Sequence, residues 1–209
     1  MIGWGGSGQT YLMEQFGKHG VKINHWNDED KIKHCTYDYF INHNKYKLTS
    51  DSLHNVHIIY MYCDPALAIA SYYRRNFAKA QHYKLNRSRE EPSSTAAKCG
   101  RYASIPDTFQ QYVNTTIESS NDSFNYLRHI TQWMSAPKIY PMTLEDIVKN
   151  KEQLSSKLSV STKLFDGIKI KPRSSKHNTS IEFRKLYLQV FNDARILSRK
   201  YLNNNLKKI

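Results

Sequence analysis

The stretch Gly3-Trp4-Gly5-Gly6-Ser7-Gly8-Gln9-Thr10 has the spacing of the phosphate-binding loop GxxxxGK[ST], with Gln9 in place of the lysine. It follows Met1-Ile2, the end of a predicted strand, and precedes a predicted helix over residues 10–16. Glycines let backbone N–H groups turn toward an anion, the helix adds its positive end, and the hydroxyls of Ser7 and Thr10 add donors. The missing lysine would bridge the outer phosphates of a nucleoside triphosphate, so an ordinary ATPase or GTPase is disfavoured. The plain alternative is a glycine-rich turn that binds no ligand.

Strand and helix patterns alternate along the rest of the chain. Residues 56–62 (VHIIYMY) are the strongest strand signal, and Asp64-Pro65 after them combines a favoured N-cap with proline at the first helical position. Because this alternation favours a mostly parallel sheet covered on both faces, we expect the α/β class, with ligands beyond the carboxyl ends of the strands. The other predicted strands are residues 21–23, 39–41 and 138–142. The predicted helices are residues 65–84, 104–116, 123–134, 143–150 and a last helix capped by Thr179-Ser180-Ile181-Glu182; the first of these has Ile69, Tyr73 and Phe77 on one face. Residues 86–101 and 167–178 are predicted loops.

Composition favours one folded domain over residues 1–209. Hydrophobic residues make up 39% and charged residues 23% of the chain, which fits a soluble globular protein. No apolar run approaches the roughly 20 residues of a membrane span, and the beginning of the sequence resembles neither a signal nor a transit peptide. Cys35, Cys63 and Cys99 are odd in number and lack CxxC spacing, which argues against a disulfide framework or a zinc site. We therefore expect a cytoplasmic protein.

The chain is strongly basic, since 31 Lys+Arg against 18 Asp+Glu give a formal net charge of +13. This charge fits either a nucleic-acid surface or a site for small polyanions such as phosphorylated nucleotides. The basic residues are scattered, apart from Arg74-Arg75, residues 171–176 and Lys207-Lys208, and no RNA-binding signature is present. A nucleic-acid partner is therefore supported by charge alone.

Several segments together resemble the sulfotransferase family. Residues 5–12 (GGSGQTYL) look like its 5′-phosphosulfate loop, PxSGTTxL, and residues 58–73 (IIYMYCDPALAIASYY) look like its 3′-phosphate motif, VIYVxRxPxDxxxSYY. Residues 109–133 and 139–147 (IYPMTLEDI) resemble its aromatic helices and a strand that ends in a YEDL-like turn. The resemblance implies a divergent member with a three-layer P-loop fold, a mostly parallel central sheet flanked by helices. It also implies transfer of a sulfuryl group from 3′-phosphoadenosine 5′-phosphosulfate (PAPS) to a hydroxyl or amine of a small-molecule or glycan acceptor, without a metal.

The same resemblance implies which residues bind the nucleotide. Ser71 keeps the family's spacing for the 3′-phosphate, but Cys63 stands where the family's arginine binds that phosphate, and Gly6 stands where the family often has lysine or arginine. Arg74, Arg75 and Lys176 could replace the missing charge, as could Arg173, in a basic stretch that vaguely resembles the family's nucleotide-closing loop. The implied cofactor-binding residues are Gly5, Gly6, Ser7, Gly8, Gln9, Thr10, Ser71 and Arg173.

A hydroxyl acceptor also needs a base, and histidine is the usual one near neutral pH. In many sulfotransferases a histidine follows a short strand about 20 residues before the 3′-phosphate motif. His43 follows the predicted strand over residues 39–41 and lies at that distance from Cys63, so it is the predicted catalytic base. His34 is the second candidate. Glu14 and Glu145 are carboxylates near the expected crevice, but Glu145 is expected to order its turn instead.

Three other functions stay open at this point. They are a non-catalytic relative that binds a nucleotide or an anionic glycan, a P-loop kinase acting on a small molecule, and a nucleic-acid-binding module. Gln9 disfavours the kinase, because the phosphate-bridging lysine is missing. Tight binding of PAP, the desulfonated product of PAPS, would favour the sulfotransferase, and tight binding of ATP would favour the kinase. Nothing in the sequence indicates an oligomeric state.

Overall fold

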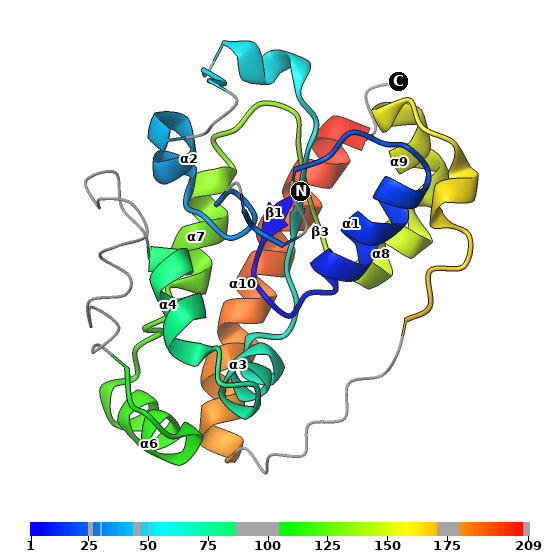
Figure 1. Cartoon of the computed structure of the whole chain (residues 1–209). Coiled ribbons are helices and arrows are strands. Elements are labelled where there is room, and N and C mark those ends of the chain that lie inside the picture. Colours follow the sequence, from blue (N-terminus) through cyan, green and yellow to red (C-terminus); the bar gives the residue numbers. More distant parts are fainter. Residues whose placement is uncertain are drawn as a thin grey trace.

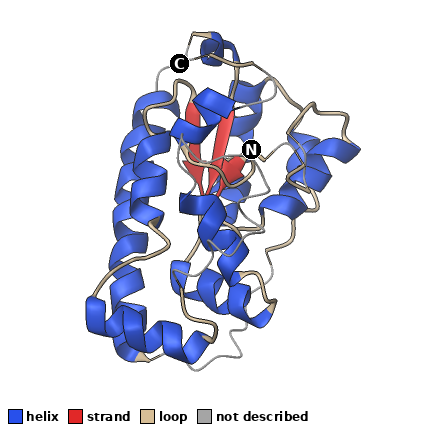
Figure 2. Cartoon of the chain, turned by 60° about the vertical axis from the view of Figure 1, so that its left-hand side comes forward, coloured by secondary structure: helices blue, strands red, loops and turns tan. Residues whose placement is uncertain are grey.

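Three short parallel strands form the sheet in this computed structural model, which describes residues 1–24, 27–29, 31–43, 47–49, 51–86, 105–170 and 180–206, with residues 201–206 as backbone only. The strands lie in the order β1 (Ile2–Gly3), β2 (Ile58–Met61), β3 (Ile139–Met142). Ile2 pairs with Tyr60, and Ile58 pairs with Ile139. Figure 2 shows the sheet enclosed by helices. The expected α/β class is confirmed as a mixed α/β chain with a small parallel sheet.

Helices connect and surround these strands (Figure 1). Two of them, η1 (Ser52–Asn55) and η3 (Thr162–Phe165), are short 3-10 helices. The α-helices are α1 (Gln9–Lys18), α2 (Tyr37–His43), α3 (Pro65–Arg74), α4 (Ala78–Asn86), α6 (Phe109–Ser119), α7 (Tyr126–Trp133), α8 (Leu144–Lys149), α9 (Lys151–Leu158) and α10 (Ile181–Leu206).

The two faces of the sheet belong to two separate apolar clusters, because successive side chains of a strand point to opposite faces. Ile58 and Tyr60 of β2 pack with α3, α7 and α10. Ile59 and Met61 pack with α1, α8 and α9. Figure 1 shows α1 and α8 on one side of the strands and α7 on the other. Helices therefore cover the described sheet on both faces.

The first helices after the three strands all begin at one edge of the sheet. α1 follows β1, α3 follows β2 and α8 follows β3, and parallel strands have their carboxyl ends at the same edge. Asp64 caps α3 as predicted, since its Oδ1 accepts hydrogen bonds from the backbone of Ala66 and Leu67 at 2.9 and 3.4 Å. Thr143 and Asp146 cap α8 with a reciprocal capping box. The N-termini of three helices thus converge where a ligand is expected.

One predicted strand is instead a helix. Residues 39–41 lie inside α2, because Thr36 caps that helix: its Oγ1 accepts a hydrogen bond from the Tyr39 N–H at 3.2 Å, and its carbonyl accepts one from Phe40 at 3.0 Å. Residues 21–23, also predicted as a strand, have no regular structure. Both runs are only three residues long, too short for their apolar period to separate a strand from a turn of helix.

The long helix predicted over residues 65–84 is broken into α3 and α4. Asn76 takes a left-handed conformation, with φ of 58°, and the Phe77 N–H closes α3 by donating to the carbonyl of Tyr72 at 2.8 Å. Phe77, predicted to share a buried face with Ile69 and Tyr73, is 55% exposed as a result.

The remaining local predictions agree with the structure in type, with shifted ends. β2 and β3 are shorter than predicted, and α6 and α7 begin later. Residues 87–104, which include most of the predicted loop over 86–101, lie outside the described residues, as do residues 171–179, which include most of the predicted loop over 167–178.

Candidate functional site

The glycine loop joins the end of β1 to the start of α1. Gly6 and Gly8 have φ of 78° and 84°, left-handed values that favour glycine. Gly8 is the N-cap of α1, and no side-chain cap hydrogen bond is formed there among the residues that the structure describes. The first-turn N–H groups of α1 have no acceptor within the helix. They are therefore placed to meet an anion, whereas α3 and α8 are capped by their own side chains.

Side chains from three helices pack around this loop. The Tyr72 hydroxyl of α3 donates to the carbonyl of Gly5 at 2.5 Å. The amide of Gln81 in α4 lies 2.7–2.9 Å from the place where a Cβ on Gly5 would stand, and Leu144 of α8 lies 3.1 Å from a Cβ placed on Gly8. A side chain at position 5 would displace the Gln81 amide, and one at position 8 would also be strained by the φ of 84°. Gln81 is 8% exposed, and its Nε2 has no hydrogen-bond partner among the residues that the structure describes.

Two polar residues of the loop stabilise its conformation. The hydroxyl of Ser7 donates to the carbonyl of Trp4 at 2.8 Å, so this proton is already used inside the loop. Gln9 is buried, and its Nε2 donates to the carbonyl of Lys33 at 3.1 Å. Thr10, in contrast, is exposed. The structure thus brings the six predicted loop residues together, with Ser7 and Gln9 engaged by the protein itself.

A residue that the sequence reasoning missed lies beside the loop. The ammonium of Lys33 is 2.5 Å from the Oγ1 of Thr10, in the first turn of α1, and Lys33 is only 6% exposed. Its carbonyl accepts hydrogen bonds from the N–H of Gly3 at 3.0 Å and from Gln9, and its own N–H donates to Asp28 Oδ1 at 2.9 Å. No motif marks this lysine, because its position beside the loop depends on contacts with Gly3, Gln9 and Thr10, which are distant in the sequence.

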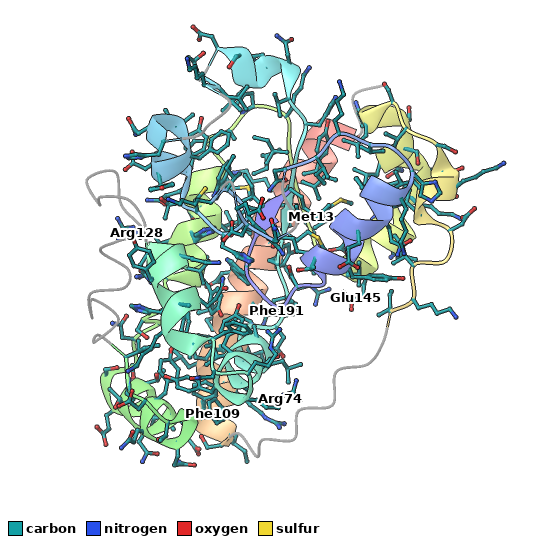
Figure 3. The ribbon with its side chains drawn as sticks, in the orientation of Figure 1. Met13, Arg74, Phe109, Arg128, Glu145 and Phe191 are labelled. Atoms are coloured by element: carbon teal, nitrogen blue, oxygen red, sulfur yellow. The ribbon has the colours of Figure 1, made fainter. Side chains whose placement is uncertain are left out.

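Ser71, the predicted 3′-phosphate residue, is half-buried on α3 next to Tyr72, whose hydroxyl reaches the loop. The Nε of Arg75 donates to the carbonyl of Ser71 at 3.1 Å, and its guanidinium lies 5.7 Å from the centre of the Phe77 ring. Cys63 is half-buried against the apolar cluster of α3, α7 and α10. Arg74 is exposed at the end of α3 (Figure 3). Arg173 and Lys176 lie outside the described residues.

His43, the predicted base, is not brought to the loop. It is exposed at the end of α2, where its ring stacks on Tyr39 with centroids 4.5 Å apart. α2 packs through Phe40 on Trp133, at one end of α7, whereas Tyr126 at the other end packs on Trp4 beside the loop. One length of α7, about 10 Å, therefore separates the two regions, and Figure 1 shows α2 near the opposite end of the sheet.

His34, the second candidate base, belongs to a buried hydrogen-bond chain. Its Nδ1 donates to the carbonyl of Gly3 at 2.8 Å, and its own carbonyl accepts from Nε2 of His129 at 3.3 Å. The hydroxyl of Tyr60 then donates to Nδ1 of His129 at 2.6 Å. Burial lowers the pKa of His34 to about 4 and that of His129 to about 3, with Lys84 and Lys33 lowering the pKa of His34 further and Asp28 opposing them. Both imidazoles are neutral near pH 7 and join β1, β2 and α7.

Carboxylates also lie at this edge of the sheet. Asp146 completes the capping box of α8 through hydrogen bonds with Thr143 at 2.8–3.1 Å. The neighbouring Glu145 is exposed and, because Leu144 packs on Gly8, lies close to the start of α1 (Figure 3). The turn before α8 is thus capped by Thr143 and Asp146, and Glu145 lies exposed near the start of α1.

Comparison with protein-family models, with curated proteins and with solved structures finds no match for this chain. Within the described residues, no helix has the length and apolar character needed to cross a membrane. The same residues contain no group of three or more His, Cys, Asp or Glu side chains arranged to hold a metal ion.

The buried histidines make stability depend on pH. An unfolded histidine takes up a proton as the pH falls below 6.5, whereas folded His34 resists protonation down to about pH 4, so the unfolding free energy decreases as the pH falls through this window. For His34 alone we expect a loss of about 2 kcal/mol between pH 7 and pH 5. Urea unfolding at several pH values measures it.

The matched variant is His34→Asn, whose amide can still donate to Gly3 but does not titrate. We expect its stability to change less with pH than that of the wild type. An equal pH dependence in the two proteins would mean that His34 is not kept neutral by burial.

Proposed function

We propose that this chain is a PAPS-dependent sulfotransferase with a three-layer P-loop fold, acting on a hydroxyl or amine of a small-molecule or glycan acceptor. The observation that carries the proposal is the N-terminus of α1, which follows a glycine loop at the carboxyl edge of the sheet and has no side-chain cap within the described part of the chain. Backbone N–H groups in this arrangement suit the 5′-phosphate end of a nucleotide. The other two strand-to-helix turns at this edge, from β2 to α3 and from β3 to α8, follow the loop in the order of the family's motifs and support the same donor.

The 3′-phosphate distinguishes PAPS from ATP, and the surroundings of Ser71 suit such a group. Tyr72 ties this turn of α3 to the glycine loop, so one nucleotide could reach both. The side chain of Arg75 lies beside Ser71, because its Nε donates to the Ser71 carbonyl, and it is exposed to solvent. We assign to Arg75 the positive charge that Cys63 does not supply.

The proposed reaction is a direct transfer of the sulfuryl group. The acceptor oxygen or nitrogen forms a bond to sulfur while the bond between sulfur and the 5′-phosphate oxygen breaks. That oxygen keeps the electron pair and leaves as part of PAP, and the acceptor's proton passes to a base. The loop N–H groups would stabilise the charge that develops on the leaving oxygen. The protein's contribution is mainly position and electrostatics, as in phosphoryl transfer.

The first test is the preference for PAP over AMP, which lacks the 3′-phosphate. We expect the wild type to bind PAP at least about tenfold more tightly, because a charge-assisted hydrogen bond contributes roughly 1.5–3 kcal/mol. Arg75→Gln should reduce this preference, whereas Arg128→Gln, a matched change at an exposed arginine of α7 (Figure 3), should leave it unchanged. Isothermal titration calorimetry measures the affinities of the wild type and the two variants for PAP and AMP.

A wild type that binds AMP and PAP equally would contradict the 3′-phosphate site, and tighter binding of ATP than of PAP would favour the kinase. Binding of none of these nucleotides by the folded protein would rule out the sulfotransferase proposal.

For the base, we propose Glu145 in place of His43, because Glu145 is exposed beside the start of α1. His43 stays the alternative prediction. A general base typically contributes about 10²–10⁴-fold in rate. With an acceptor found by screening sugars, phenols and amines with labelled PAPS, Glu145→Gln should lower turnover at least a hundredfold while PAP affinity is unchanged. Glu14→Gln, on the exposed face of α1, is the control. A comparable loss in His43→Ala, with normal turnover in Glu145→Gln, would return the role to His43.

A further inference from the structure

We propose that Lys33 supplies the cation that the glycine loop lacks at Gln9, and that its ammonium binds a phosphate oxygen at the start of α1. The inference rests on the proposed function in that a phosphate occupies the loop. Its basis is the contact of 2.5 Å between the Lys33 Nζ and the Oγ1 of Thr10. Because Thr10 accepts this hydrogen bond, its own hydroxyl proton stays available for a ligand.

The backbone of Lys33 is held firmly at this place. Its carbonyl accepts from both Gly3 and Gln9, and its N–H donates to Asp28. Gln9 occupies the motif's lysine position, so the residue that replaced a lysine now helps to position another lysine. The charge reaches the loop from a neighbouring segment instead of from the helix itself.

The electrostatics of this arrangement favour an anion. The N-terminus of a helix carries partial positive charge, and the Lys33 ammonium beside the first turn of α1 adds a full positive charge at the same place. Nearby, Oδ2 of Asp28 forms an ion pair with Lys84 at 2.6 Å, and its Oδ1 accepts from the Lys33 backbone N–H. A phosphate at the loop would meet the ammonium and the helix N-terminus together.

An independent observation on the other side of the loop also suggests a ligand. The Gln81 side chain is buried against Gly5, and its Nε2 donor has no partner among the described residues. A buried donor without an acceptor costs free energy unless something binds it. A phosphate oxygen at the loop is an acceptor of the right kind. Lys33 and Gln81 would then approach the same anion from two sides.

In the proposed transfer, this position gives Lys33 a direct role. When the bond between sulfur and the 5′-phosphate oxygen breaks, the electron pair stays on that oxygen. An ammonium fixed beside the loop stabilises this charge without having to reorganise during the reaction. Lys33 is thus a catalytic residue as well as a binding residue.

The experiment compares Lys33→Gln with the wild type, using PAP and inorganic pyrophosphate as probes. Glutamine can still donate to Thr10, so the change removes the charge and keeps a polar side chain. We expect PAP affinity to fall between about tenfold and a hundredfold. Lys33→Arg, which keeps the charge, should lose less. Lys18→Gln, at the other end of α1, should bind like the wild type. Circular dichroism and thermal unfolding verify that each variant is folded.

The outcomes separate this inference from the proposed function. If the wild type binds PAP and folded Lys33→Gln binds it equally well, Lys33 is not the cation, and the sulfotransferase proposal stands. If the wild type binds pyrophosphate but not PAP, and Lys33→Gln loses the pyrophosphate, the cation role is supported and the PAPS proposal fails. If the wild type binds neither probe, both are overturned. If Lys33→Gln does not fold, Lys33→Arg is compared with a folded Lys33→Met variant. Equal PAP affinity of these two variants would overturn the role of the charge.

Discussion

The hydrogen bonds between Gly3 and the segment of residues 32–36 are the constraint on which the candidate site depends. Gly3 donates to the carbonyl of Lys33 and accepts from the imidazole of His34. Its φ of 147° and the carbonyl of Met61, 1.9 Å from the place of a Cβ, leave no space for any other residue. These hydrogen bonds of Gly3 fix the end of β1, the start of the glycine loop and the position of Lys33 together. A side chain at position 3 would disturb all of them.

The polar residues near the loop divide into two groups. Ser7, Gln9, His34 and His129 form hydrogen bonds within the protein that hold the loop and residues 32–36 in place. Lys33, Thr10 and Gln81 lie around the loop, and in the proposed site their charge and hydrogen-bond donors would meet the ligand. A rigid inner group that supports a small ligand-facing group is the arrangement that pre-organised sites require.

Local patterns predicted much of the fold. β2 and the capped start of α3 follow from an apolar run and from Asp64-Pro65, because both depend on neighbouring residues. Residues 39–41 were predicted wrongly as a strand, since the run is too short to show a helical period and the Thr36 cap lies outside it. The break at Asn76 was missed because no proline or glycine marks it.

The glycine loop could be found from spacing, but its charge could not. Lys33 reaches the loop through contacts with Gly3, Gln9 and Asp28, and no local pattern encodes this set. His43 was chosen by its spacing from Cys63, and the structure places it beyond the far end of α7. Spacing within one segment predicted the position of the glycine loop between a strand and a helix, whereas contacts between two segments could be seen only in the three-dimensional structure.

A crystal structure of the protein bound to PAP tests the central claim most directly. The account predicts that the 5′-phosphate lies within hydrogen-bond distance of the first-turn N–H groups of α1 and of the Lys33 ammonium, with the 3′-phosphate beside Ser71 and Arg75. PAP bound elsewhere, with the glycine loop unoccupied and Lys33 in contact only with the protein, would contradict it.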